Sequence, residues 1–148
     1  MNLSRLAPSD ERKSIGTERK QDRVRILLAD DNAEILTHAS ELLQSNYDIV
    51  GTVADGSQVC SETRKLRPEL VVLDISMGEW SGIDVAKRLK QQGFAGKIMF
   101  MSVHEDPDFV SAALGSGGRA YVIKQRMAED LRPAIKAVLS DQMFISAP

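Results

Sequence analysis

The 148-residue chain is 43% hydrophobic, which is enough to bury the core of one domain without disulfides or a structural metal. Its 19 basic and 21 acidic residues give a formal net charge of -2, so the chain lacks the basic footprint of a protein that binds nucleic acid or an anionic membrane. No apolar run approaches the roughly 20 residues that span a bilayer, and the only cysteine is Cys60, which together predict a cytoplasmic protein without disulfides.

The first residues differ in composition from the rest of the chain. Residues 1–22 are charged, contain serine and show no sustained hydrophobic period. This predicts a disordered leader, or residues that derive in part from a cloning vector. From residue 24 onward, short apolar runs alternate with helical patterns, and this alternation predicts an α/β domain over residues 23–140.

The first half of that domain contains two strand and helix pairs. Residues 24–29 form a continuous apolar run, and a helical stripe follows over about 33–44. Residues 47–54 form the second apolar run. Asp55 is a candidate N-cap for a second helix that ends near Leu66.

The second half continues the same alternation. The remaining strands are predicted over 70–74, 97–101 and 120–123. Ser81 can cap a third helix, and Asp106 can cap a fourth that has Pro107 as its first residue. A fifth apolar stripe is formed by Leu131, Ile135, Val138 and Leu139. Five such units with right-handed crossovers predict a doubly wound, five-stranded parallel sheet with helices on both faces.

Polar residues follow four of the five predicted strands. Asp30 and Asp31 follow the first strand, Asp74 ends the third, Ser102 follows the fourth and Lys124 follows the fifth. Ligands of open parallel sheets bind beyond the carboxyl ends of the strands, so these side chains are predicted to meet at one edge. Taken singly, each has an ordinary interpretation, because Asp31 or Asn32 could cap a helix, Asp74 and Ser102 could serve turns, and Lys124 could be a solvated charge.

The residue types predict the chemistry of that edge. Three carboxylates without clustered histidine or cysteine favour a hard cation, and Mg²⁺ fits best. A cation also explains why Asp30 and Asp31 stand side by side, since like charges repel unless a positive charge lies between them. A carboxylate there can act as a nucleophile toward phosphorus, with Lys124 stabilising the transferred group and Ser102 donating a hydrogen bond to it.

This set of residues resembles a known family, the receiver domains of two-component response regulators. The similar segments are "LLADDN", "VVLDISMGEWSGIDVAKRL", "IMFMSVHED" and "GSGGRAYVIK". The resemblance implies a flavodoxin-like sheet with strand order 2-1-3-4-5. It also implies roles for seven residues: Asp74 as phosphoacceptor, Asp31, Asp74 and the Ser76 carbonyl as Mg²⁺ ligands, Asp30 as the holder of a metal-bound water, Ser102 as switch hydroxyl, Tyr121 as rotating switch aromatic, and Lys124 as the family's lysine.

The resemblance also implies partners. A sensor histidine kinase would donate the phosphoryl group, and the domain would act as a switch rather than as an enzyme. The change would alter the surface of the fourth helix, fifth strand and fifth helix, and homodimers are possible. The segment "YVIKQRMAEDLRPAIKAVLSDQMFIS" resembles LuxR/NarL-type regulators, so residues 141–148 are predicted to begin a linker to an absent helix-turn-helix domain, the only expected contact with DNA. This favours a truncated regulator over a stand-alone receiver.

Two positions depart from the family pattern. Met77-Gly78 replaces the usual Met-Pro, which predicts a looser loop after the acceptor. Gln125 replaces the proline that often follows the lysine, and the isomer of the Lys124–Gln125 peptide stays open.

Two other classes of function are alternatives. An aspartyl phosphatase or phosphotransferase would use Asp30 as its nucleophile, but "ADDNAE" lacks the Asp-x-Asp pattern of such enzymes. An interaction module that is independent of phosphorylation would not need the intact acidic set.

His38 is expected on the helix surface, His104 in the loop near the phosphoryl pocket, and Trp80 in the loop after Asp74.

Overall fold

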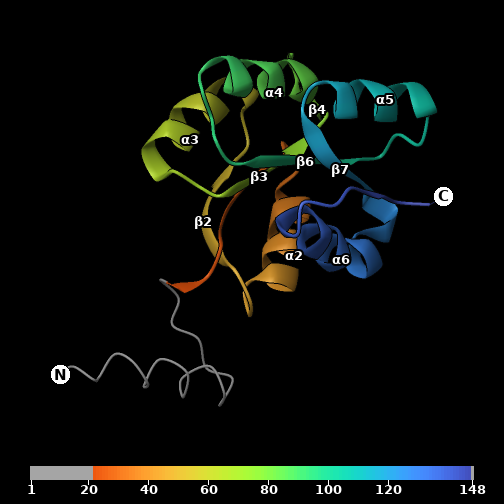
Figure 1. Cartoon of the computed structure of the whole chain (residues 1–148), viewed down its shortest axis with the longest axis horizontal. Helices are drawn as coiled ribbons and strands as arrows, with labels where there is room; N and C mark the ends of the chain where they lie inside the picture. Colours follow the sequence, from red (N-terminus) through yellow and green to blue (C-terminus); the bar gives the residue numbers. More distant parts are fainter. Residues whose placement is uncertain (1–21, 148) are drawn as a thin grey trace.

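The chain forms one parallel sheet between two layers of helices (Figure 1). This computed structural model describes residues 22–147. The strands of the main sheet are β1 Arg25–Ala29, β2 Asp48–Val53, β3 Leu70–Asp74, β6 Lys97–Ser102, β7 Gly118–Ile123 and β8 Phe144–Ile145. The helices are α2 Ala33–Leu43, α3 Val59–Leu66, α4 Gly82–Gln91, α5 Pro107–Gly115 and α6 Met127–Leu139. Two short 3₁₀ helices, η3 Gly56–Gln58 and η4 Lys124–Arg126, precede α3 and α6.

The sheet order is β2-β1-β3-β6-β7-β8. Its first five members are the five predicted strands in the predicted order 2-1-3-4-5, so the fold class is confirmed. The sixth strand is an addition to the prediction: β8 pairs parallel to β7, with Phe144 opposite Ala120 and Ile145 opposite Tyr121. A strand of two residues has no periodicity of its own, so its pattern in the sequence does not distinguish it from a linker.

The sheet separates two apolar cores. Leu27, Val71 and Leu73 face the layer of α3, α4 and α5, whereas Leu28 and Val72 face the layer of α2 and α6 (Figure 1). Successive side chains of a strand point to opposite faces, so strands that are covered on both faces need apolar residues at every position. This is why the runs that predict the strands are continuous rather than alternating.

The helix starts follow the predicted caps. The Ser81 hydroxyl accepts a hydrogen bond from the Ile83 amide at the start of α4, and the Asp106 carboxylate accepts one from the Asp108 amide at the start of α5. Asp55 caps the 3₁₀ turn η3 rather than α3 itself. The predicted second helix is therefore a 3₁₀ turn followed by an α-helix.

The loop after Asp74 forms a regular hairpin, although Gly78 predicts a looser loop. Ser76–Met77 (β4) and Trp80–Ser81 (β5) form a small antiparallel hairpin, and Gly78 turns it at a positive φ of 64°. Residues with a Cβ seldom adopt this conformation, so the glycine enables a tight turn here instead of loosening the loop. The hairpin leads into Gly82, where a Cβ would lie 2.1 Å from the Asp74 carbonyl oxygen. Only glycine allows α4 to begin so close to the end of β3.

The chain shows no membrane-spanning element in its described part: none of the helices within residues 22–147 is both long enough and apolar enough to cross a bilayer. The peptide bond between Lys124 and Gln125, whose isomer the sequence left open, is trans.

Candidate functional site

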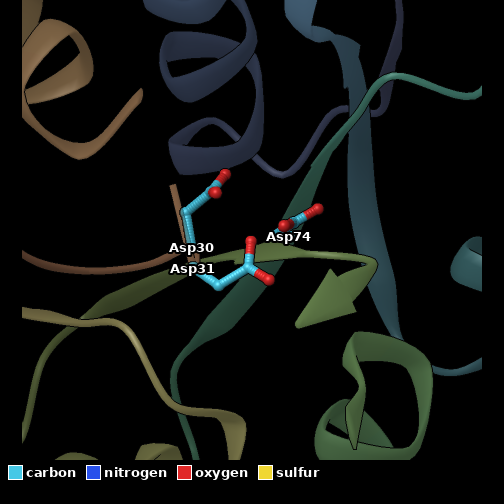
Figure 2. Close-up of side chains that lie close together, drawn as sticks. All are labelled: Asp30, Asp31 and Asp74. Atoms are coloured by element: carbon cyan, nitrogen blue, oxygen red, sulfur yellow. The ribbon is translucent and has the colours of Figure 1, made fainter. Parts of the chain in front are cut away.

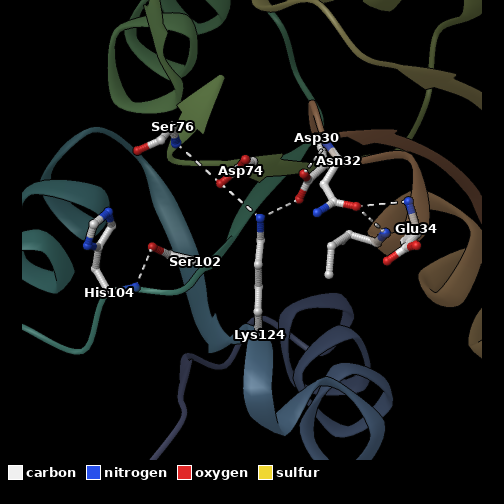
Figure 3. A network of polar contacts seen from close by, with 9 residues as sticks. Asp30, Asn32, Glu34, Asp74, Ser76, Ser102, His104 and Lys124 are labelled. Carbon is white, nitrogen blue, oxygen red and sulfur yellow. Dashed lines mark hydrogen bonds and ion pairs between the residues drawn. The ribbon is translucent and has the colours of Figure 1, made fainter. Parts of the chain in front are cut away.

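The carboxyl ends of three strands bring the predicted charged residues together (Figures 2 and 3). Asp30 and Asp31 follow β1, Asp74 is the last residue of β3, and Lys124 follows β7. One carboxylate oxygen from each of the three aspartates lies within 4.8 Å of the others. The predicted convergence at this edge is therefore present.

The three acids differ in their access to solvent. Asp30 is fully buried and Asp74 is 4% exposed, whereas Asp31 is exposed. Asp30 and Asp74 thus lie at the buried end of the cluster, and Asp31 lies at its solvent side. A small reagent or a partner's side chain would approach Asp74 from the side of Asp31.

Lys124 supplies the positive charge of the cluster. Its Nζ lies 2.7 Å from Asp30 Oδ2 and 3.3 Å from Asp74 Oδ1 (Figure 3). The lysine side chain is only 11% exposed, so these ion pairs are shielded from bulk water. Charges taken out of water are stable only when paired, and one ammonium between two buried carboxylates leaves net negative charge in the pocket.

Backbone amides orient the two buried acids. The Asn32 amide donates to Asp30 Oδ1 at 2.9 Å, and the Ser76 amide donates to Asp74 Oδ1 at 3.2 Å. The Asn32 side chain in turn caps α2 by accepting from the amides of Glu34 and Ile35. Asn32 rather than Asp31 therefore caps the helix, and this leaves Asp31 for the acidic cluster.

The electrostatics of the pocket act on Asp74 most strongly. Its pKa is raised from 3.8 to about 6, first by burial and then by the negative charge of Asp30, while Lys124 opposes both. The ionised form of Asp74, which a nucleophile needs, is therefore less favoured here than it is in water. An additional cation beside it would favour the ionised form.

The donor set fits a hard divalent cation. Three carboxylates offer oxygen ligands within reach of a common point, and the pocket has more negative than positive charge. Oxygen ligands of this kind suit Mg²⁺, which keeps several waters and tolerates an open side. The residues that could hold it here are Asp30, Asp31 and Asp74.

Ser102 and Tyr121 are both tied to the backbone of His104. Ser102 is buried, and its hydroxyl oxygen accepts from the His104 amide at 3.0 Å. The hydrogen of that hydroxyl can still donate to another group. The Tyr121 hydroxyl donates to the His104 carbonyl at 2.8 Å, and its side chain is 1% exposed. The Tyr121 ring, predicted to be a rotating switch aromatic, thus lies inside in this structure.

Four other residues singled out in the sequence lie outside the acidic cluster. His38 is exposed on α2, and Cys60 is half-buried against the core. The His104 ring stacks on Phe109 with the ring centroids 4.2 Å apart. Trp80 shares a surface cavity with Asp31, and the Arg88 guanidinium lies 5.5 Å from its ring centroid.

The raised pKa of Asp74 predicts a pH dependence of stability. Because the folded protein binds this proton more tightly than the unfolded chain, the contribution of Asp74 to the free energy of unfolding should fall as pH rises from about 4 to about 6 in EDTA. The decrease is roughly 2 to 3 kcal/mol, at about 1.4 kcal/mol for each pKa unit. Asp74→Asn lacks this penalty, so in urea unfolding it should exceed the wild type in stability at pH 7. Parallel pH profiles of the two proteins would contradict this assignment.

Sequence comparison places these features among known proteins. Residues 26–136 match the response regulator receiver domain family. The transcriptional regulatory protein PdtaR of Mycobacterium tuberculosis is 32% identical over 124 residues, which are 83% of this chain and 60% of PdtaR. The nitrate/nitrite response regulator protein NarL of Escherichia coli K12 is 30% identical over 128 residues, which are 85% of this chain and 59% of NarL. The chain thus spans about three fifths of the length of these relatives.

Solved structures agree with that placement. A LuxR-family two-component response regulator from Aurantimonas sp. SI85-9A1 superposes with a TM-score of 0.79 at 26% identity, over 84% of this chain and 90% of that one. The non-phosphorylated receiver domain of the stress response regulator RcsB from Escherichia coli has the same fold, with a TM-score of 0.78 at 23% identity, over 84% of this chain and 99% of that one. The family match covers most of the described chain, including the acidic cluster and Lys124. The chain therefore belongs to the response regulator receiver domain family of two-component signalling and is similar to its NarL and LuxR-type members.

Proposed function

We propose that Asp74 is the phosphoacceptor of this receiver domain and takes its phosphoryl group from the phosphohistidine of a cognate sensor histidine kinase. The observation that carries this proposal is the position of Asp74 at the buried end of the acidic cluster, 4% exposed, beside Lys124 and two further acids. A receiver domain is a signalling switch rather than an enzyme. The acceptor residue is therefore consumed and must be regenerated by hydrolysis.

The transfer exchanges one bond to phosphorus for another. An oxygen of the ionised Asp74 carboxylate forms an O–P bond, the P–N bond of the phosphohistidine breaks, and the imidazole leaves with the electron pair. Lys124, now 3.3 Å from Asp74 Oδ1, would pair with the transferred phosphoryl oxygens. Ser102 would donate its hydroxyl hydrogen to one of them.

Mg²⁺ would be held by Asp31, Asp74 and the Ser76 carbonyl, with Asp30 binding one of its waters. When bound, it supplies positive charge that offsets the charge of the phosphoryl group and of the acids. The acids serve this role because their oxygens already converge, and their mutual repulsion makes cation binding favourable.

The switch would act through His104. Its amide donates to Ser102 and its carbonyl accepts from Tyr121, so a displacement of Ser102 toward the phosphoryl group acts on the Tyr121 hydroxyl through a single residue. Modification would then favour the inward position of Tyr121 over an outward one and change the surface of α5, β7 and α6. A local charge change is in this way read at a distance by biasing a two-state element.

The output is proposed by analogy with the relatives. PdtaR is a transcriptional regulatory protein, and NarL is a nitrate/nitrite response regulator. By this analogy the domain would control transcription. Its resemblance to LuxR/NarL-type regulators favours a C-terminal helix-turn-helix domain as the output and a second copy of the chain as a candidate partner. A stand-alone receiver, or an interaction module that works without phosphorylation, is the alternative.

Mg²⁺ dependence tests the proposal. Incubation with acetyl phosphate and Mg²⁺ should add one phosphoryl group to the protein, detected by intact mass spectrometry, and EDTA should reduce the labelled fraction to background. Mg²⁺ alone should change the fluorescence of Trp80, because this side chain shares a cavity with Asp31. Labelling that is equal in EDTA would contradict the metal assignment. A protein that neither binds Mg²⁺ nor becomes labelled would support the interaction module.

A further inference from the structure

The chain returns along β7 after the last helix. Phe144–Ser146, which we name the C-terminal strap, lies beside β7 and pairs parallel to it. The Ser146 amide donates to the Tyr121 carbonyl at 2.8 Å and continues the pairing one residue past β8. The strap thus covers the edge of the strand that carries Tyr121 and leads to Lys124.

A polar latch closes the end of the strap. Ser146 is 6% exposed, and its hydroxyl accepts from the Ile123 amide at 3.1 Å and donates to Asp130 Oδ2 at 2.7 Å. Asp130 is itself buried, and Arg126 Nε donates to the same carboxylate oxygen at 2.9 Å. The hydroxyl therefore acts both as donor and as acceptor, and alanine would leave a buried amide and a buried carboxylate each without this partner.

The other end of the strap is anchored as well. Asp141 turns the chain at a positive φ of 62° and forms an ion pair with Lys97, the first residue of β6. The Asp141 carbonyl accepts from Arg119 Nη2 at 3.3 Å. Phe144 packs against the core on the side of α2 and α6, whereas Met143 is 55% and Ile145 is 49% exposed. Polar contacts at both ends, together with the packing of Phe144, hold the strap in place.

The latch lies one residue from the charged pocket. Ser146 bonds the amide of Ile123, and the next residue is Lys124, whose ammonium contacts Asp30 and Asp74. Resting on the function proposed above, we propose that Ser146 is a positioning residue for Lys124, and that closure of the latch is coupled to the state of Asp74. The closed latch fixes the backbone from which Lys124 reaches the phosphoryl group.

Linkage sets the sign of this coupling. If closure of the latch places Lys124 correctly, closure raises the affinity of Asp74 for a phosphoryl group or its analogue by some factor. That group must then shift the equilibrium toward the closed latch by the same factor. A contact that only stabilises the fold would not show this reciprocity. The two factors can be measured independently on the same protein.

The experiment uses the full chain with Mg²⁺ and beryllofluoride, a phosphoryl analogue that binds the acceptor carboxylate. In the wild type, beryllofluoride should slow amide hydrogen exchange at Ile123 and Ser146 by about fivefold, the lower range of allosteric couplings. Ser146→Ala should speed their exchange about tenfold through loss of the latch and weaken beryllofluoride binding about fivefold. Ser146→Thr keeps the hydroxyl and should restore both quantities. Met143→Ser changes an exposed residue just before the strap and should match the wild type.

Asp130→Asn is the second variant should Ser146→Ala not fold. It keeps the size of the side chain but weakens the bonds to Ser146 and Arg126, so it should shift both quantities in the same direction by a smaller factor. Wild-type beryllofluoride affinity in a folded latch variant would overturn the role of the strap and leave Asp74 as the acceptor. A wild-type protein that does not bind beryllofluoride would overturn the proposed function together with the coupling.

Discussion

Asp74→Asn is expected to abolish labelling by acetyl phosphate. The amide lacks the anionic oxygen that forms the bond to phosphorus, whereas its shape and its place at the end of β3 are preserved. Removal of a covalent nucleophile lowers the rate by at least about a thousandfold, so the labelled fraction should fall to background. Intact mass spectrometry over a time course with Mg²⁺ measures this.

The matched control is Asp84→Asn, which makes the same chemical change on the exposed side of α4. It should label at the rate of the wild type. If the protein were instead a phosphatase or phosphotransferase with Asp30 as its nucleophile, Asp74→Asn would still be labelled. Persistent labelling of Asp74→Asn at the wild-type rate is the result that would remove Asp74 from the mechanism.

Lys124→Met is expected to slow labelling while strengthening Mg²⁺ binding. Methionine keeps most of the apolar stem but removes the ammonium that lies between Asp30 and Asp74. Loss of one group that stabilises developing charge costs on the order of 100- to 1,000-fold in rate. The uncompensated acids should meanwhile attract a divalent cation more strongly. Labelling kinetics and Mg²⁺ titration of Trp80 fluorescence measure the two opposite changes.

The same variant should lose stability when no metal is present. Breaking a buried ion pair by removing one partner costs about 3 kcal/mol or more, and here two buried carboxylates lose their shared cation. Urea unfolding in EDTA should show this loss, and Mg²⁺ should recover much of it. Lys87→Met, on the exposed face of α4, is the control and should change neither labelling nor stability. A Lys124→Met protein with wild-type labelling and stability would show that the ammonium has no part in the site.

Much of the fold could be predicted because the chain obeys simple periodicities. Strands that are buried on both faces require continuous apolar runs such as residues 70–74, and these runs are easy to recognise. The acids and the lysine could be predicted as a group because the ends of parallel strands share one edge. Residues separated by nearly a hundred positions thus become neighbours through topology alone.

The remaining features depend on contacts that one sequence does not encode locally. Asp31 and Asn32 can both cap a helix, and only the structure shows that Asn32 does so. The position of Tyr121 depends on a hydrogen bond to His104, which comes from another strand end. The role of Ser146 depends on pairing with β7, and its only local signal is the short apolar run Met143–Ile145 before it.

In the proposed mechanism, Asp74 accepts the phosphoryl group at a site that it shares with Asp30, Asp31 and Lys124. This requires that phosphorus becomes bonded to a carboxylate oxygen of Asp74. The protein is allowed to react with acetyl phosphate and Mg²⁺, and the acyl phosphate is trapped. Peptide mapping by mass spectrometry then identifies the residue that carries it. We expect modification at Asp74 and none at Asp30. Modification at Asp30, or at neither aspartate under conditions that label a known receiver domain, would contradict this expectation.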